Sequence, residues 1–400
     1  MKLAFISIED VQDVRSWSGT PHFVLKELQR RGIDVEVISP LSRRYRYWYV
    51  PHKIIAKLTG RSLQIMRHPI ALRSFARQIE RRLKRKQIDA IFSTSSVPIS
   101  RLRAGVPVLY WTDAVIEGMS DYYHGDFANL SQREMRIAHD QEQAAMDRCS
   151  FAIYSSNWAA RTVKNFYKIT GDKVQIIEFG ANLPVDHDIN DIVRFTDERL
   201  SLKKPECILL FIGVDWERKG GALAFEAARL LNERGIKTVL KVAGCDAPEA
   251  SFVERLGFIS KHTPEGQLRI KNLLATSTFL ILPTRAEASA IVYCEAAAYG
   301  LPALSTKTGG VEDYVIDSQT GYCLPLEATG SAYADLIAKT CAEPETYRRL
   351  SLGAFERYKQ ILNWDVAVSS LLDLTERAIR GNRPQGASPM HSPAPQRMEM

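Results

Sequence analysis

The sequence lacks the features of a membrane-spanning or secreted protein. No run approaches the roughly 20 apolar residues that cross a bilayer. The N-terminal stretch MKLAFISIED has one lysine and a short strand-like run, so we expect no signal peptide. The cysteines have neither metal-site spacing nor a disulfide framework, which predicts reduced core thiols in a cytoplasmic protein. They are Cys149, Cys207, Cys245, Cys294, Cys323 and Cys341.

Short repeats, a Walker motif and a recognised nucleic-acid motif are also missing, so we expect no nucleic-acid partner. The composition is ordinary for a globular protein, with 45% hydrophobic and 25% charged residues. The net charge of +7 is uneven, however, because residues 41–90 carry 14 Lys and Arg against 2 Asp and Glu. That segment therefore holds +12 and the rest of the chain −5.

Strand-like and helix-like patterns alternate along the chain, which is typical of parallel sheets with crossover helices. A length of 400 residues favours two domains. We expect an α/β protein with two Rossmann-like, doubly wound domains that face a cleft. The expected parts are an N-terminal domain at 1–185, a linker without strong periodicity at 186–206, a second domain at 207–360, a last helix at 361–380 and a disordered tail at 381–400.

Two acids mark the segment RAEASAIVYCEAAAYGLPALSTKTGG, residues 285–310. The apolar run FLILP at 279–283 predicts a buried strand just before it, and Ser289 is a reasonable N-cap for a helix that ends at Gly300. Glu287 then lies in the loop and Glu295 within the helix. Free N–H groups at Ala290 and Ile291 form an anion site between these acids. The alternative interpretation is a solvated Glu287 and a Glu295 paired with a basic residue in the core.

A second cluster is GVDWERKGG, residues 213–221, between the predicted strand 207–213 and the predicted helix 221–234. Arg218 and Lys219 precede the helix start, where two cations suit a diphosphate. The competing interpretation is a pair of ordinary surface cations. Both clusters follow strands of one predicted sheet at the same end. A strand is also predicted for GFIS, residues 257–260.

These segments carry a family resemblance. GVDWERKGG, KVAGCD, GFISK and ILPTRAEASAIVYCEAAAYGLPALSTKTGGVEDYV, in this order, resemble the nucleotide-sugar domain of retaining GT-B glycosyltransferases, closest to family 4 (glycosyl transferases group 1). The pair Glu287 and Glu295 reproduces the family's E-x7-E motif. The similarity is continuous over residues 207–325 and looser elsewhere, at SSNWAARTVKNFY (155–167), IIEFGANL (176–183) and NWDVAV near Trp364.

The resemblance implies roles for the matching positions. Glu295 would hold the ribose diol, and Glu287 would meet donor-sugar hydroxyls near the reacting carbon. The diphosphate would be held by Arg218, Lys219 and the backbone of Ser289, Ala290 and Ile291. Phe258 in the GFIS loop would border the base, and Gly19 would let the N-terminal domain approach the diphosphate. The last helix would cross back onto the N-terminal domain.

The sequence departs from the family pattern in three places. Ala288 and Ala290 stand where the family often has glycine. Val214 occupies the usual position of the family's arginine, so Arg218 would have to substitute. Thr112 and Asp113 replace a His-Asp pair, so Asp113 has either a catalytic or acceptor-orienting role or an N-cap role.

The function that follows is a retaining glycosyltransferase that moves a sugar from a nucleotide-diphosphate donor to an acceptor hydroxyl, in polysaccharide or glycolipid biosynthesis. No metal is expected, because no Asp-x-Asp motif stands beside the diphosphate and Arg218 and Lys219 supply the charge. No other cofactor is expected either. The alternatives are a nucleotide-sugar epimerase or a pyridoxal-phosphate-dependent phosphorylase on this fold, and a non-catalytic sugar-binding subunit.

The basic segment has two interpretations. RRYRYWYVPHK, from Arg43, interleaves cations with Tyr45, Tyr47, Trp48 and Tyr49, which suits peripheral contact with anionic lipid at the inner face of the membrane and a lipid-linked or glycan acceptor. The other interpretation is a core-packed element with a solvated basic face. For the helix that follows, the spacing of Leu72, Phe75, Ile79 and Leu83 favours the core.

Overall fold

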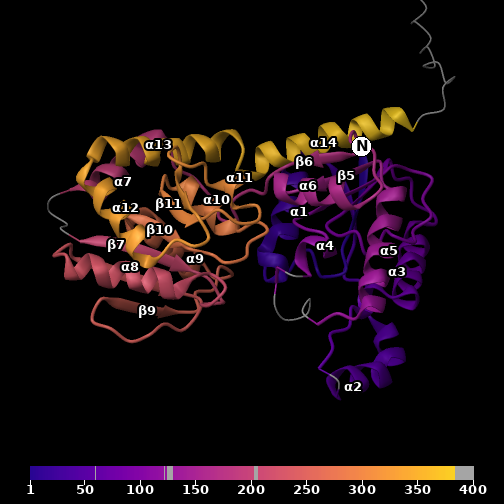
Figure 1. Ribbon diagram of the computed structural model, residues 1–400. Helices are drawn as coiled ribbons and strands as arrows, with labels where there is room; N and C mark the ends of the chain where they lie inside the picture. The colour runs from indigo at the N-terminus through magenta and orange to yellow at the C-terminus, as the bar shows by residue number, and fades with distance from the viewer. Residues whose placement is uncertain (59, 121, 124–128, 202–205, 383–400) are drawn as a thin grey trace, which may run out of the picture.

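The computed structural model describes residues 1–58, 60–120, 122–123, 129–201 and 206–382. Two six-stranded parallel sheets stand side by side with helices packed around each (Figure 1). The predicted α/β architecture with two doubly wound units is therefore confirmed. Residues 383–400 of the expected tail lie outside the described residues.

The N-terminal sheet has the order β2-β1-β3-β4-β5-β6. Its strands are β1 (Lys2–Ile6), β2 (Asp34–Ile38), β3 (Ala90–Ser93), β4 (Val108–Thr112), β5 (Phe151–Tyr154) and β6 (Val174–Ile176). Its helices and 3-10 turns are η1 (Ser16–Gly19), α1 (Thr20–Arg30), η2 (Arg44–Tyr49), α2 (Val50–Leu58), η3 (Ile65–Arg67), α3 (Pro69–Leu83), α4 (Ile116–Met119), α5 (Gln132–Arg148) and α6 (Asn157–Phe166).

The C-terminal sheet has the order β12-β11-β10-β7-β8-β9. Its strands are β7 (Cys207–Ile212), β8 (Thr238–Ala243), β9 (Val253–Gly257), β10 (Phe279–Leu282), β11 (Ala303–Thr306) and β12 (Gly321–Leu324). The helices that follow in the chain are α7 (Ile189–Leu200), α8 (Gly221–Glu233), α9 (Pro264–Thr276), α10 (Ile291–Ala298), α11 (Val311–Tyr314), α12 (Gly330–Ala342), α13 (Pro344–Gln360) and α14 (Trp364–Gly381).

The central strands are continuous apolar runs because helices cover both faces of each sheet. All four residues of β10 are fully buried, and so are Leu209, Leu210 and Phe211 of β7. These two strands pair in parallel, with Phe279 opposite Leu209. From β7 the chain builds outward to β9 on one side, and from β10 to β12 on the other. The carboxyl ends of β7 and β10 are therefore a topological switch point, where α/β sheets bind ligands.

The segment expected to be an aperiodic linker contains a regular helix, so that expectation was wrong. Asp188 caps α7 in a capping box with Asp191. The helix packs against α13 and α9, and its Thr196 hydroxyl lies 2.6 Å from that of Ser351. A polar sequence concealed the helix because only its buried face carries the packing residues.

Arg199 at the end of α7 supports two neighbouring helices. Its buried guanidinium donates to the carbonyl groups of Leu274 and Ala275 at the end of α9, and of Tyr299 and Gly300 just after α10, at 2.8–3.0 Å. These are helix C-terminal carbonyls that have no partner within their own helix. Burial lowers the pKa of Arg199. Its charge is offset by four carbonyl dipoles.

The last helix, α14, runs from the C-terminal half across the top of the N-terminal half (Figure 1) and contacts α1. Its first residue, Trp364, donates an indole hydrogen bond to Asn182 (2.9 Å) and packs on Trp111. Gly180 is essential to that contact, since a Cβ there would lie 2.5 Å from the Trp364 backbone nitrogen. Arg31 of the N-terminal half is paired with Asp365 at 2.8 Å. The two halves are thus joined by a tryptophan anchor and an ion pair.

We predict that Arg199→Met lowers the free energy of unfolding by roughly 3–5 kcal/mol, because buried helix-terminal carbonyls lose their charged donor. Urea unfolding followed by circular dichroism measures this change. Arg194→Met on the exposed face of α7 is the matched control and should cost less than about 1 kcal/mol. Equal losses in the two variants would contradict the capping role.

Candidate functional site

The site begins at the switch point of the C-terminal sheet. Arg218 and Lys219 lie in the turn after β7, and Glu287 lies in the loop after β10. Gly220, at φ +75°, allows the first turn to press against the second, because a Cβ there would lie 2.0 Å from the carbonyl oxygen of Pro283. The backbone N–H of Arg285 then donates to the carbonyl of Arg218 at 2.8 Å. The two sequence clusters therefore meet as one structural unit.

Glu287 is buried and charge-paired, so the solvated interpretation of this residue was wrong. Its side chain forms an ion pair with the ammonium group of Lys219. The guanidinium of Arg218 lies 3.4 Å from the same carboxylate oxygen and donates to the Ala286 carbonyl at 2.8 Å. Arg218 is also 3.3 Å from Asp215. Both cations lie partly or fully within the protein, which excludes the interpretation that they are ordinary surface cations.

Helix α10 begins later than the sequence predicts. Its N-cap is Ala290, which makes no side-chain capping bond, so Ser289 is not the N-cap. The Ser289 hydroxyl instead lies 3.2 Å from that of Ser155 in the N-terminal half. Ala290, Ile291 and Val292 line a cavity. Their N–H groups belong to the start of a helix, where no intrahelical acceptor exists.

Glu295 is fully buried in α10 and bound by Lys261, whose ammonium lies 2.6 Å from one carboxylate oxygen and contacts the other. The interpretation of Glu295 as a partner of a basic residue thus describes its state in this structure. Among the described residues that line the cavity, Lys261 is present and Glu295 is not. A ligand would reach Glu295 only after Lys261 had moved.

The N-terminal wall of the cavity comes from the segment after β1. Trp17 (φ 46°), Ser18 (φ 56°) and Gly19 (φ 89°) form a left-handed turn, and such strained backbone in non-glycine residues often marks a functional site. Trp17 and Ser18 line the cavity beside Arg15, whereas Gly19 lies behind them at the N-cap of α1. The sequence prediction named Gly19 as the residue of this turn that approaches the donor. In the structure its neighbours Trp17 and Ser18 form the wall of the cavity.

Asp113 follows β4 and lines the same cavity. Helix α4 is capped by Val115, so the N-cap role for Asp113 was wrong. The pKa of Asp113 is raised to about 6, mainly by burial and in smaller part by the charge of Glu287, while backbone hydrogen bonds and the Trp17 indole N–H oppose the shift. A carboxyl group that titrates near neutral pH in a cleft is a candidate for proton transfer or for binding a hydroxyl.

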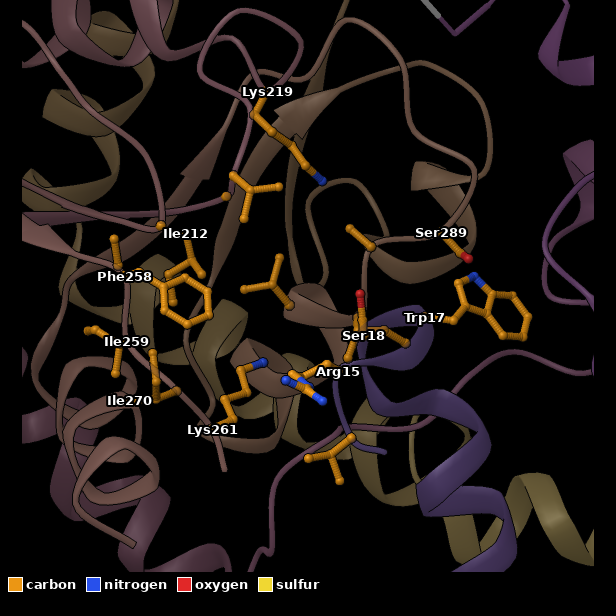
Figure 2. Close-up of a pocket in the computed structure, with 18 of the residues that line it drawn as sticks. Arg15, Trp17, Ser18, Ile212, Lys219, Phe258, Ile259, Lys261, Ile270 and Ser289 are labelled. Atoms are coloured by element: carbon orange, nitrogen blue, oxygen red, sulfur yellow. The ribbon is translucent and has the colours of Figure 1, made fainter. Parts of the chain in front are cut away.

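The cavity holds about 480 Å³ between the two halves. Lys219, Lys261 and Arg15 extend toward it, and Phe258 closes one end beside Ile212, Ile259 and Ile270 (Figure 2). The strand predicted at 257–260 lies earlier, at Val253–Gly257, so Phe258 belongs to the turn after β9 and is 75% exposed. The described lining residues include four basic side chains, Arg15, Arg218, Lys219 and Lys261, and two acidic ones, Asp113 and Glu287. The cavity therefore suits an anion attached to a flat apolar group.

Sequence reasoning missed Arg15, Trp17, Ser18 and Lys261. Lys261 directly follows the quoted GFIS loop, and a buried glutamate needs a cation, so this partner had a weak signal. Arg15 and Trp17 had none, since their importance depends on how the two halves face each other.

The protein family described as "Glycosyltransferase Family 4" matches residues 22–183 of this chain. The family described as "Glycosyl transferases group 1" matches residues 193–357. The fold and these matches define the class, glycosyltransferases of the GT-B fold. More narrowly, the chain combines a glycosyltransferase family 4 domain at residues 22–183 with a glycosyl transferases group 1 domain at residues 193–357.

One relative is a D-inositol 3-phosphate glycosyltransferase of Gordonia bronchialis, 24% identical over 70% of this chain and 63% of its own length. The chain thus spans less than two thirds of that relative. Two solved structures share the fold. Sucrose-phosphate synthase from Thermosynechococcus elongatus has a TM-score of 0.67 at 17% identity, covering 95% of this chain and 99% of its own. HepE from Anabaena, in complex with UDP and glucose, has a TM-score of 0.60 at 15% identity, covering 94% and 100%.

We predict that Asp113→Asn stabilises the protein at pH 8. The raised pKa means that the folded state resists ionisation, so this contribution to stability is full below pH 4 and is lost as the pH rises through about 6. The variant should gain up to about 3 kcal/mol at pH 8, and the gain should vanish near pH 4. Urea unfolding at both values measures it, with the exposed Asp172→Asn as control. A gain at pH 4 as large as at pH 8 would contradict the assignment.

Proposed function

We propose that this protein is a retaining glycosyltransferase that uses a nucleotide-diphosphate-sugar donor. The observation that carries the proposal is the convergence of four cations, a helix N-terminus and two carboxylates on one cleft cavity. A diphosphate would bind Arg218, Lys219 and the N–H groups of Ala290 and Ile291. Negative charge grows on this group as the glycosidic bond breaks, so these donors bind the transition state more strongly than the ground state.

The remaining parts of the donor have matching surroundings. The base would rest against Phe258 and its apolar neighbours, and the ribose would reach Glu295 in exchange for Lys261. Glu287 would contact the transferred sugar, and its spacing from Glu295 supports retention of anomeric configuration by resemblance to the family. UDP is bound by HepE. We propose that the cations replace a divalent metal.

The acceptor would be held by the N-terminal half. Asp113 would accept the proton of the acceptor hydroxyl or orient that hydroxyl. A pKa of about 6 suits a group that must exchange a proton near neutral pH. An acceptor that is a glycan or a lipid-linked group, in polysaccharide or glycolipid assembly, would approach from this side.

We predict that nucleotide sugars raise the melting temperature, since a ligand at 100 times its Kd adds about 2.7 kcal/mol. Lys219→Ala and Glu295→Ala should each weaken the affinity for the best donor by at least about tenfold, because each removes a charged contact. Thermal shift and calorimetry measure both effects. EDTA should not reduce transfer, and sugar turnover should require an acceptor.

The control for this experiment is Lys237→Ala, which removes an exposed lysine of the same domain. It should bind donor like the wild type. Unchanged affinity in both site variants would refute the donor site, and turnover without acceptor would favour an epimerase.

We also propose that the basic segment contacts an anionic membrane at its cytoplasmic face. Tyr45 and Tyr49 are buried, Tyr45 against Phe75 of α3, and Leu72, Phe75 and Ile79 lie in the core as expected. Tyr47 and Trp48, by contrast, are 79% and 73% exposed. Within this aromatic run, Tyr45 and Tyr49 therefore pack in the protein, whereas Tyr47 and Trp48 face the solvent.

Helix α2 extends this outward surface. It projects away from the N-terminal sheet (Figure 1). Val50, Ile54 and Leu58 are four residues apart, on one face, and all are exposed, Leu58 by 81%. Arg44, Arg46 and Lys53 are exposed beside them. Apolar side chains flanked by cations and a tryptophan suit a helix that lies in the lipid interface. Among the described helices, none is long and apolar enough to cross a bilayer.

We predict that the protein sediments with anionic liposomes more than with neutral ones, and less at high salt. Ile54→Ser/Leu58→Ser should weaken binding at both salt concentrations. Arg44→Ser/Arg46→Ser should weaken it mainly at low salt, since each cation adds roughly 1 kcal/mol. Arg43 is excluded because it pairs with Glu9.

The matched control is Arg81→Ser/Arg82→Ser, which removes the same charge from the exposed face of α3. It should retain most of the binding. Equal binding to both lipids, or equal losses in control and test variants, would refute the membrane surface.

A further inference from the structure

Two adjacent tyrosines of the N-terminal half reach across the cleft to the loop that carries Glu287. The Tyr122 hydroxyl accepts a hydrogen bond from the backbone N–H of Glu287 at 2.9 Å. The Tyr123 hydroxyl accepts one from the N–H of Ala288 at 2.6 Å. Consecutive N–H groups of one domain are thus bound by consecutive side chains of the other.

Tyr122 is packed against side chains of both halves of the molecule. The Tyr122 ring packs 5.2 Å from Trp158 and 5.3 Å from Tyr123, between ring centroids. Its hydroxyl also lies 2.6 Å from that of Thr308. Gly309, at φ +54°, makes room, since a Cβ there would lie 2.5 Å from the Tyr122 hydroxyl and 2.0 Å from the Glu287 carbonyl oxygen. Gly309 is therefore needed for this contact.

The contact bears directly on the donor cavity. Because the N–H groups of Glu287 and Ala288 are engaged by the pair, the loop presents Ser289, Ala290 and Ile291 to the cavity. The guanidinium of Arg218 lies 5.5 Å from the centroid of the Tyr123 ring, within cation–π range. Burial raises the pKa of both phenols, so their hydroxyls stay protonated and neutral beside Glu287.

We propose that Tyr122 and Tyr123 are positioning residues that make the reactive geometry of Glu287 depend on closure of the two domains. The proposal rests on the glycosyltransferase function proposed above. The groups assigned to the diphosphate and ribose belong to the C-terminal half, and their binding of donor does not depend on the two tyrosine hydroxyl bonds. Glu287 takes its working position only when the N-terminal half, which carries Asp113, is in place. Transfer then occurs only with the acceptor side assembled.

The test is the double variant Tyr122→Phe/Tyr123→Phe, which keeps the rings and removes both hydroxyls. We expect kcat to fall at least about tenfold, since small misplacements of a reacting group are costly. The donor Kd should change less than about threefold, and the melting temperature should stay close to that of the wild type. Small-angle X-ray scattering should give a larger radius of gyration, because the closed form has lost two interdomain bonds.

A variant from the other side of the contact checks the same claim. Gly309→Ala should lower kcat at least as far, because its Cβ displaces both the Tyr122 hydroxyl and the Glu287 carbonyl oxygen from this contact. Tyr154→Phe is the matched control, since it removes a buried tyrosine hydroxyl bonded to Tyr110 at 2.7 Å in the core of the N-terminal half. It should leave both kcat and the radius of gyration unchanged.

An unchanged kcat in the double variant, or parallel losses of kcat and donor-binding stoichiometry, would overturn the proposal. If the wild type transfers no sugar from any donor, the proposed function fails but scattering still decides the closure. An unchanged radius of gyration would then refute the role of the tyrosine pair, and an increase would support it.

Discussion

The neutralisation of the Glu287 carboxylate inside the cleft is the interaction on which the rest of the site depends. A buried carboxylate without a partner would cost several kcal/mol. Lys219 and Arg218, which lie 68 and 69 residues earlier in the chain, provide the partners. They arrive because β7 and β10 are neighbours in the sheet and because Gly220 lets the two turns touch. The fold thus brings the charges of Arg218, Lys219 and Glu287 together, and these side chains line the cavity between the two domains.

The two halves contribute unequal chemistry to that cavity. The C-terminal half supplies most of the cations and the helix start, while the N-terminal half supplies Arg15, Asp113 and the strained turn at Trp17. Their relative placement is fixed at several points away from the cavity. Asn157 is held by Asp313 at 2.6 Å, and Trp364 anchors α14 on the N-terminal half. A site divided in this way depends on the domain interface as much as on its own residues.

The sequence predicted those parts of the site that depend on local patterns, and it missed those that depend on contacts between distant residues. Apolar runs such as FLILP identify strands locally, and parallel strands bring their carboxyl ends to one edge, so the meeting of Arg218, Lys219 and Glu287 could be anticipated. Asp113 follows β4 of the other sheet, and its place in the cavity depends on how the two domains face each other. Helix α7 was missed although Asp188 and Asp191 form a capping box, because its apolar face is narrow. The start of α10 was misplaced because tertiary contacts, including Ser289 with Ser155, replaced a local cap. The partners Arg15, Trp17 and Tyr122 leave no local pattern at all.

The ion pair between Lys261 and Glu295 has a consequence for the catalytic cycle. In the resting cleft the ammonium group occupies the carboxylate that the proposed ribose would bind, so the protein carries an internal competitor for its own ligand. Donor entry is then an exchange, in which one hydrogen-bonding partner of Glu295 replaces another. Under the proposed function the same exchange would run backwards after reaction, when Lys261 would return and displace the spent nucleotide. Such an exchange would lower the affinity for donor and product alike, and it would favour rapid turnover over tight binding.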